Sequence, residues 1–316
     1  MARLKTVYLD QNAWIDLFRE SYGDAHDPQV EASLNHVKDS VVAGRAIYPI
    51  SLVHMLETSH QVDPERRDSL ADFMYDVSRG WAIYPFPVVI DVEVRSLAFE
   101  LAGIPTLGRK WYTVIGIGIG HLLGGKPTVV FPAAPKIQEE LQKVVEGPGL
   151  IKWAMMNDQV MRRAAGQGSG YAVWINDMEQ VRSDLATIGD LRVRRRFDLY
   201  NHLAQLILPR LSNRISAMGL ALDFPPMNTE SEVVAFAKRT PTAYCLWTLS
   251  YNLARDVGHR LVANDFRDLA SLSGALGYCD IIVTERRWTS AARQEGLDRE
   301  FGSTALNSVR NLGQHL

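Results

Sequence analysis

The chain lacks the features that would link it to an oxidising compartment or, through its overall charge, to nucleic acid. Only two of its 316 residues are cysteine, and Cys245 and Cys279 stand in no CxxC or zinc-ligand spacing. A disulfide framework is therefore not expected, and scarce cysteine fits a reducing cytosol. The formal net charge of −2 gives no overall attraction to a polyanion, so nucleic-acid binding would need a local basic patch.

Long hydrophobic runs are missing as well. The most apolar stretch, WYTVIGIGIGHLLGG from Trp111 to Gly125, is rich in glycine and shorter than the roughly 20 apolar residues of a membrane-spanning helix. The N-terminus leads directly into a strand-like run, without the apolar segment or cleavage site of a signal peptide. We therefore expect a cytoplasmic protein that does not interact with membranes.

Short β-branched and aromatic runs alternate with helical patterns in the first hundred residues. TVYLD (Thr6–Asp10), AIYPIS (Ala46–Ser51) and WAIYPF (Trp81–Phe86) predict three short strands, and the segments between them have helical periodicity. Strands that alternate with helices favour a parallel sheet with helices packed around it. The expected fold class is α/β.

The middle of the chain has a different pattern. Residues 104–239 contain long helical periodicities separated by Gly/Pro breaks such as EGPG and LDFPPMN, without strand–helix alternation. The α/β pattern then returns with the strand DIIVTE (Asp280–Glu285) and a final segment that predicts an edge strand and a short helix. We predict one α/β domain made of residues 1–103 and 240–316, interrupted by a mostly helical insertion at residues 104–239.

Five carboxylates of the flanking segments stand at predicted strand ends or early in helices. They are Asp10, Glu57, Asp265, Asp268 and Glu285. In an open parallel sheet such positions meet in the crevice at the carboxyl edge of the strands. Carboxylates packed closely repel one another, and a hard divalent cation such as Mg²⁺ or Mn²⁺ would neutralise them. The pattern predicts a metal site that activates water for phosphodiester hydrolysis.

Several of these residues have other interpretations. Asp265 and Asp268 stand in a first helical turn, where free N–H groups and the helix dipole favour acids anyway, so which of them is a ligand stays open. Asp280 precedes its strand and should be a turn or cap residue at the opposite edge of the sheet. His54 and His60 flank Glu57, and we expect both to be surface residues.

The order of these residues resembles a PIN-like domain, the nuclease superfamily that includes many toxin–antitoxin ribonucleases. The matching segments are VYLDQNAWIDL, YPISLVHMLE, NDFRDLASLSGAL and CDIIVTERRW, in flanks of about 180 residues, and the insertion has no counterpart. The usual Thr-x-Asp ending reads Thr284-Glu285-Arg286 here, which leaves the role of Glu285 open. Thr284 and Asn12 are candidates for hydrogen-bond donors beside the acids.

The resemblance implies a metal-dependent endonuclease that acts on RNA in preference to DNA and leaves 5′-phosphate and 3′-hydroxyl ends. Asp10, Glu57 and one or both of Asp265 and Asp268 would be ligands of Mg²⁺ or Mn²⁺. The resemblance leaves open whether the chain is a toxin or defence effector that an antitoxin or sensor protein holds inactive. It also leaves open whether the chain forms a homodimer. The alternative is an inactive PIN-like scaffold or RNA-binding protein.

Two basic segments are candidates for substrate binding. Arg194 and Arg195 belong to the run LRVRRRFDLYNH, whose aromatic residues could stack on bases. Arg286 and Arg287 directly follow the predicted acid site. The alternative for the first run is a solvated helix face that forms ion pairs with neighbouring aspartates.

Overall fold

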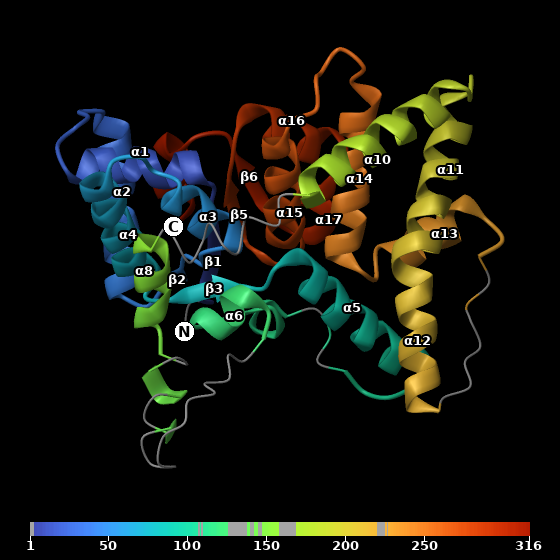
Figure 1. Cartoon of the computed structure of the whole chain (residues 1–316), viewed down its shortest axis with the longest axis horizontal. Coiled ribbons are helices and arrows are strands. Elements are labelled where there is room, and N and C mark those ends of the chain that lie inside the picture. The colour runs from blue at the N-terminus through green and yellow to red at the C-terminus, as the bar shows by residue number, and fades with distance from the viewer. Residues whose placement is uncertain are drawn as a thin grey trace. The chain divides into compact units, whose positions relative to one another are not determined.

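The computed structural model describes residues 3–106, 108, 110–125, 138–139, 142–144, 147–157, 169–219, 225 and 227–316 (Figure 1). The chain divides into two compact units. The α/β unit comprises Met1–Pro85, Trp111–Gln167 and Tyr278–Leu316, and the helical unit comprises Phe86–Lys110 and Gly168–Gly277. Among the described residues, no helix combines the length and hydropathy of a membrane span.

The centre of the α/β unit is a four-stranded parallel sheet. Its strands are β1 (Lys5–Leu9), β2 (Ala46–Ile47), β5 (Ile281–Val283) and β6 (Thr304–Leu306), in the order β2-β1-β5-β6. In the register of β1 and β5, Val7 lies opposite Ile281 and Leu9 opposite Val283. The expected α/β class with a parallel sheet is thereby confirmed.

A second, two-stranded ladder continues the β structure of this unit. β3 (Trp81–Ile83) pairs antiparallel with β4 (Ile115–Ile117), and Ile50, just after β2, forms a parallel bridge with Ala82. β4 lies within residues 104–239, for which the sequence predicts a mostly helical insertion. Its three residues, with glycine in the middle, are too short and too permissive in conformation to produce a recognisable strand pattern.

Helices cover the sheet of the α/β unit. They are α1 (Gln11–Ser21), α2 (Pro28–Val42), α3 (Leu52–Ser59), α4 (Pro64–Ser78), α6 (Ile119–Leu123), α8 (Gly149–Met156), α16 (Arg286–Gln294) and α17 (Leu297–Phe301), with 3-10 turns at η1 (Trp111–Thr113) and η3 (Val309–His315). Val7 and Leu9 of β1 are completely buried and join one apolar core with Trp14 and Leu17 of α1 and Met74 of α4. Burial of this apolar surface is the main stabilising contribution.

Local signals explain where two of these helices begin. The side chain of Asp27 accepts hydrogen bonds from N–H groups in the first turn of α2, and Pro28 is the first helical residue. Asp63 and Pro64 have the same roles at the start of α4. Proline is suited to this position because its fixed φ matches the helix and it has no N–H to leave unpaired.

The helical unit contains α5 (Phe86–Leu101), α10 (Ser169–Ala186), α11 (Leu191–His202), α12 (Leu208–Met218), α13 (Glu230–Ala237), α14 (Pro241–Arg255) and α15 (Ala263–Tyr278). A π-helical turn, η2 (Leu203–Ile207), joins α11 to α12. Most of α14 is buried, and it contacts α5, α10 and α11. This division differs from the predicted one, because α14 and α15 group with the helical unit and β4 with the α/β unit.

The amino edge of the parallel sheet is held by Asp280, which precedes β5. Its Oδ2 accepts hydrogen bonds from the Thr6 N–H at 2.8 Å and the Thr6 hydroxyl at 2.9 Å, and its Oδ1 accepts one from Arg3 Nη2 at 2.9 Å. This placement agrees with the expectation that Asp280 is a turn residue at the edge opposite Glu285. The three hydrogen bonds connect the starts of β1 and β5.

We expect Asp280→Ala to lower the free energy of unfolding by about 1–3 kcal/mol, because it leaves the partly buried Thr6 N–H without its acceptor. Urea denaturation measures the loss. Asp39→Ala, at an exposed position of α2, is the control and should change stability by less than about 0.5 kcal/mol. Equal effects of the two substitutions would contradict the role assigned to Asp280.

Candidate active site

Strand pairing brings Asp10 against the residues that follow β5. Asp10 comes directly after β1, and its N–H donates to the Val283 carbonyl at 2.9 Å. Its carboxylate caps α1 by accepting the Ala13 N–H at 2.9 Å, and it also accepts hydrogen bonds from the Thr284 hydroxyl and the Glu285 N–H. Asp10, one of the acids predicted to converge at this edge, therefore lies against the end of β5.

A second carboxylate, Glu285, lies beside Asp10. Glu285 is exposed at the start of α16, and its Oε1 accepts a hydrogen bond from Asn12 Nδ2 at 2.8 Å. Burial raises the pKa of Asp10 to about 6; repulsion from Glu285 also raises it, whereas the hydrogen bonds from Ala13 and Thr284 oppose the shift. A cation at this position would favour the ionised form of Asp10.

Glu57 is a half-buried residue of α3. The next residue, Thr58, forms a hydrogen bond with α1. Gln11 Nε2 donates to Thr58 Oγ1 at 3.2 Å, so the residue after Asp10 contacts the residue after Glu57. Within the described part of the chain, no three His, Cys, Asp or Glu side chains are grouped so that they could hold a metal ion. A metal site made of several acids therefore stays a prediction. Of the predicted acids, Asp10 and Glu285 lie together in the α/β unit.

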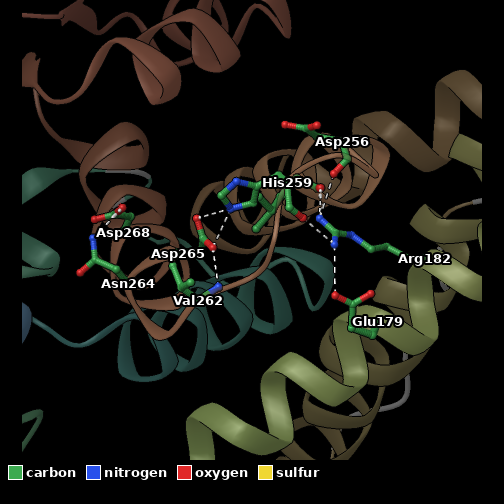
Figure 2. Close-up of polar contacts among 9 residues, drawn as sticks. Glu179, Arg182, Asp256, His259, Val262, Asn264, Asp265 and Asp268 are labelled. Atoms are coloured by element: carbon green, nitrogen blue, oxygen red, sulfur yellow. Dashed lines mark hydrogen bonds and ion pairs between the residues drawn. The ribbon is translucent and has the colours of Figure 1, made fainter.

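The acids of α15 belong to the helical unit, and they differ from each other (Figure 2). Asp265 is only 5% exposed, and His259 Nε2 lies 3.0 and 2.9 Å from its two carboxylate oxygens. Its Oδ2 also accepts the Val262 N–H at 2.8 Å, which caps the helix. Asp268 is half-buried, with Asn264 Nδ2 3.5 Å from its Oδ2. Asp265 therefore caps α15, and which of the two acids is a ligand stays a prediction.

Sequence reasoning missed Arg182, which holds the segment before α15. Its guanidinium donates to the carbonyl oxygens of Leu253, Asp256 and His259 at 2.9–3.1 Å and pairs with Glu179 at 3.1 Å (Figure 2). No spacing rule links an arginine of α10 to this segment more than 70 residues later in the chain. The interaction becomes visible only once the helices are packed.

The four predicted substrate-binding arginines have different surroundings. The Arg194 guanidinium donates to the Ile188 carbonyl at 3.1 and 2.6 Å, and the Arg195 guanidinium carbon lies 5.4 Å from the ring centroid of Trp247. Both therefore make contacts within the helical unit. Arg286 is exposed directly after Glu285.

Arg287, the fourth of these arginines, is half-buried, with its guanidinium carbon 5.3 Å from the Trp288 ring centroid. RNA binding by any of the four stays a prediction. The position of Arg286 beside the carboxylate pair favours it over the other three.

His54 corrects the expectation that both histidines near Glu57 lie at the surface. It is 1% exposed, whereas His60 is exposed. Its Nδ1 accepts the Ser51 N–H at 3.0 Å in a capping box of α3, and its ring stacks on Tyr8 with centroids 5.1 Å apart. Burial lowers the pKa of His54 to about 3. The ring is thus a neutral core group beside β1.

Comparison with known proteins finds no family model, no curated protein and no solved structure that matches the chain. The PIN-like resemblance therefore depends on the residues themselves. The geometry of the carboxyl edge and the chemistry of its side chains carry the functional argument.

We expect His54 to make stability depend on pH. Between about pH 6.5 and pH 3 the unfolded chain binds a proton at this position and the folded chain does not, so the free energy of unfolding falls as the pH falls. Replacing His54 with Gln, which can also accept the Ser51 N–H, should make this slope shallower by up to about 1.4 kcal/mol per pH unit.

Urea denaturation from about pH 7 to about pH 4.5 measures the slope. The matched control is His60→Gln, a substitution at an exposed histidine of the same unit. His202, whose pKa burial also lowers, contributes equally to all variants and cancels in the comparison. A slope that does not change in His54→Gln would show that His54 titrates as a normal histidine.

The different surroundings of the α15 acids give a second stability prediction. Asp265→Ala should lower the free energy of unfolding by about 1–3 kcal/mol, because the Val262 N–H and His259 lose their acceptor. Asp268→Ala, one turn later in the same helix, should cost less than about 1 kcal/mol. Thermal and urea denaturation of both variants test this ranking, and a larger loss for Asp268→Ala would reverse it.

Proposed function

We propose that the chain is a divalent-metal-dependent endoribonuclease whose active site lies at the carboxyl edge of β1 and β5. The observation that carries the proposal is the pair of carboxylates, Asp10 and Glu285, with the amide of Asn12 on one of them. The carboxyl edge of a parallel sheet is the usual place for ligands in this class of fold. RNA as the substrate follows from the resemblance of the acid-bearing segments to PIN-like nucleases.

The side chains at this edge fit Mg²⁺ or Mn²⁺. Mg²⁺ is commonly held by one or two carboxylates, with water and substrate phosphates completing its shell, and Asp10 and Glu285 can supply the two. The raised pKa of Asp10 and its repulsion by Glu285 are what a bound cation would relieve. When bound, the metal would activate a water and stabilise charge on the phosphate.

The chain's own residues would prepare this site. Thr284 and the backbone N–H groups of Ala13 and Glu285 orient Asp10, and Asn12 orients Glu285. Such outer partners keep ligand oxygens directed at the metal. The exposed guanidinium of Arg286, the next residue after Glu285, would contact a substrate phosphate.

Of the remaining predicted ligands, Glu57 belongs to the α/β unit, and its neighbour Thr58 is linked to Gln11. It would serve as a further acid of the site. Asp265 is disfavoured as a ligand because it belongs to the helical unit, where it caps α15. Asp268 also belongs to the helical unit, and its role as a ligand stays a prediction from the sequence.

Cleavage of a pooled single-stranded RNA and DNA set, with Mn²⁺ or Mg²⁺ and with an EDTA control, tests the function. We expect metal-dependent cleavage of RNA. Asp10→Asn and Glu285→Gln should reduce the rate more than about 100-fold, and Asn12→Ala about 10- to 100-fold, because outer partners of metal ligands typically contribute that much. Asp280→Asn, a carboxylate at the opposite edge, should retain the rate of the natural chain.

Cleavage that survives EDTA, or that Asp10→Asn leaves unchanged, would reject the assigned site. The competing proposal is an RNA-binding or scaffold protein without catalysis. It is favoured by the finding that the described residues hold no group of three metal-binding side chains. RNA binding in a gel-shift assay without cleavage under any metal condition would support that alternative.

A further inference from the structure

The helical unit contains a pocket of about 650 Å³ that no sequence pattern indicates. Residues of α10, α11, η2 and α14 line it, together with Phe86 and Phe266, and all of these belong to the one unit. Pockets of roughly 300–1,000 Å³ with mostly apolar walls and a few polar groups are typical binding sites for small molecules. Its lining therefore indicates which ligand it suits.

Aromatic rings form much of the wall of this pocket. Phe86, Trp174, Trp247, Tyr251 and Phe266 all line it. The Trp174 and Phe266 ring centroids are 5.4 Å apart, and those of Phe86 and Phe266 are 6.2 Å apart. Ring faces carry partial negative charge and attract cations. Arg195 already lies over two of these rings, with its guanidinium carbon 5.4 Å from the Trp247 centroid and 5.9 Å from the Tyr251 centroid.

The charged side chains of the pocket are all acidic. Asp177, Asp184 and Asp198 line it, and none of the described residues that line it is lysine or arginine. Asp198 accepts a hydrogen bond from Trp247 Nε1 at 2.8 Å, and burial raises the pKa of this carboxyl to about 6. A half-buried carboxylate in an aromatic wall would be stabilised by a bound cation.

His202 also lines this wall. Its ring donates a hydrogen bond to the Ala243 carbonyl, and burial lowers its pKa to about 4, so it is neutral near pH 7. Its Nε2 is buried and has no hydrogen-bond partner among the described residues. The pocket carboxylates accept hydrogen bonds, and an ammonium group only donates them.

We propose that this pocket binds an aliphatic polyamine, a methylene chain that carries two or more ammonium groups. Asp177 and Asp184 are seven residues apart on α10, so they share a face and are separated by about 10 Å along the helix. An elongated cation can reach both, and a compact one cannot. The methylenes would pack on the rings and the ammonium groups would meet the carboxylates. The proposal is independent of the nuclease activity.

Isothermal titration calorimetry of the full chain, freed of nucleic acid, tests the proposal in about 150 mM NaCl, which screens surface charges beyond about 8 Å. The probes are spermidine, putrescine, tetramethylammonium and the neutral 1,6-hexanediol. We expect spermidine to bind most tightly, putrescine more weakly, and the diol not at all. Asp198→Asn should weaken spermidine binding at least about tenfold, through loss of a charge-assisted hydrogen bond.

Asp91→Asn, an exposed acid of the same unit paired with Arg210, is the control and should leave the affinity unchanged. Thermal unfolding checks that each variant folds. Should Asp198→Asn be unstable, Asp184→Asn at an exposed position and Trp174→Leu test the same site. Three results would overturn the proposal: no binding of spermidine, equal binding of the diol, or an affinity that none of the pocket variants changes. Tighter binding of tetramethylammonium than of spermidine would reject an elongated ligand.

Discussion

The pairing of β1 with β5 is the constraint on which the α/β unit depends. It joins residues 5–9 to residues 281–283, so a short ladder closes a loop of most of the chain. Its register places Thr6 beside Asp280 at one edge and Asp10 beside Glu285 at the other. A slip by one residue would turn the buried side chains of the strand to the wrong face and separate both pairs. Packing of the core and assembly of the candidate site therefore require the same register.

The candidate site is a balance between opposing effects on one carboxyl group. Burial and the neighbouring Glu285 favour the protonated form of Asp10, whereas the hydrogen bonds donated by Ala13, Thr284 and the Glu285 backbone favour the ionised form. The pairing of β1 with β5 positions the donors of Thr284 and the Glu285 backbone, and it also brings the Glu285 carboxylate close to Asp10. The backbone thus holds an acid in a place where it is poorly neutralised by its surroundings. Positions of this kind are enriched at functional sites, because a ligand of opposite charge gains more there than at a solvated carboxylate.

Much of the α/β unit could be predicted from local patterns, because β1, β5 and β6 are buried strands that alternate with amphipathic helices. The location of Asp10 and Glu285 at the carboxyl edge of the sheet could be predicted because each residue comes at the end of a predicted strand. Contacts between distant segments could not be predicted. The division of the units depends on the packing of α14 against other helices, and the burial of His54 depends on its stacking on Tyr8. For Asp265, helix capping was a recognised alternative, but no periodicity indicates a partner six residues earlier.

The acidic character of both candidate sites limits how the chain could bind a polyanion. With a net charge of −2 and carboxylates at the carboxyl edge, RNA would be repelled unless cations neutralise these groups first. A divalent metal held by Asp10 and Glu285 would remove that repulsion, so it would contribute to binding as well as to catalysis. Exposed arginines such as Arg286 add local attraction that weakens with salt. If the chain acts on RNA, its affinity should therefore depend on divalent metal more steeply than that of a protein with a continuous basic surface.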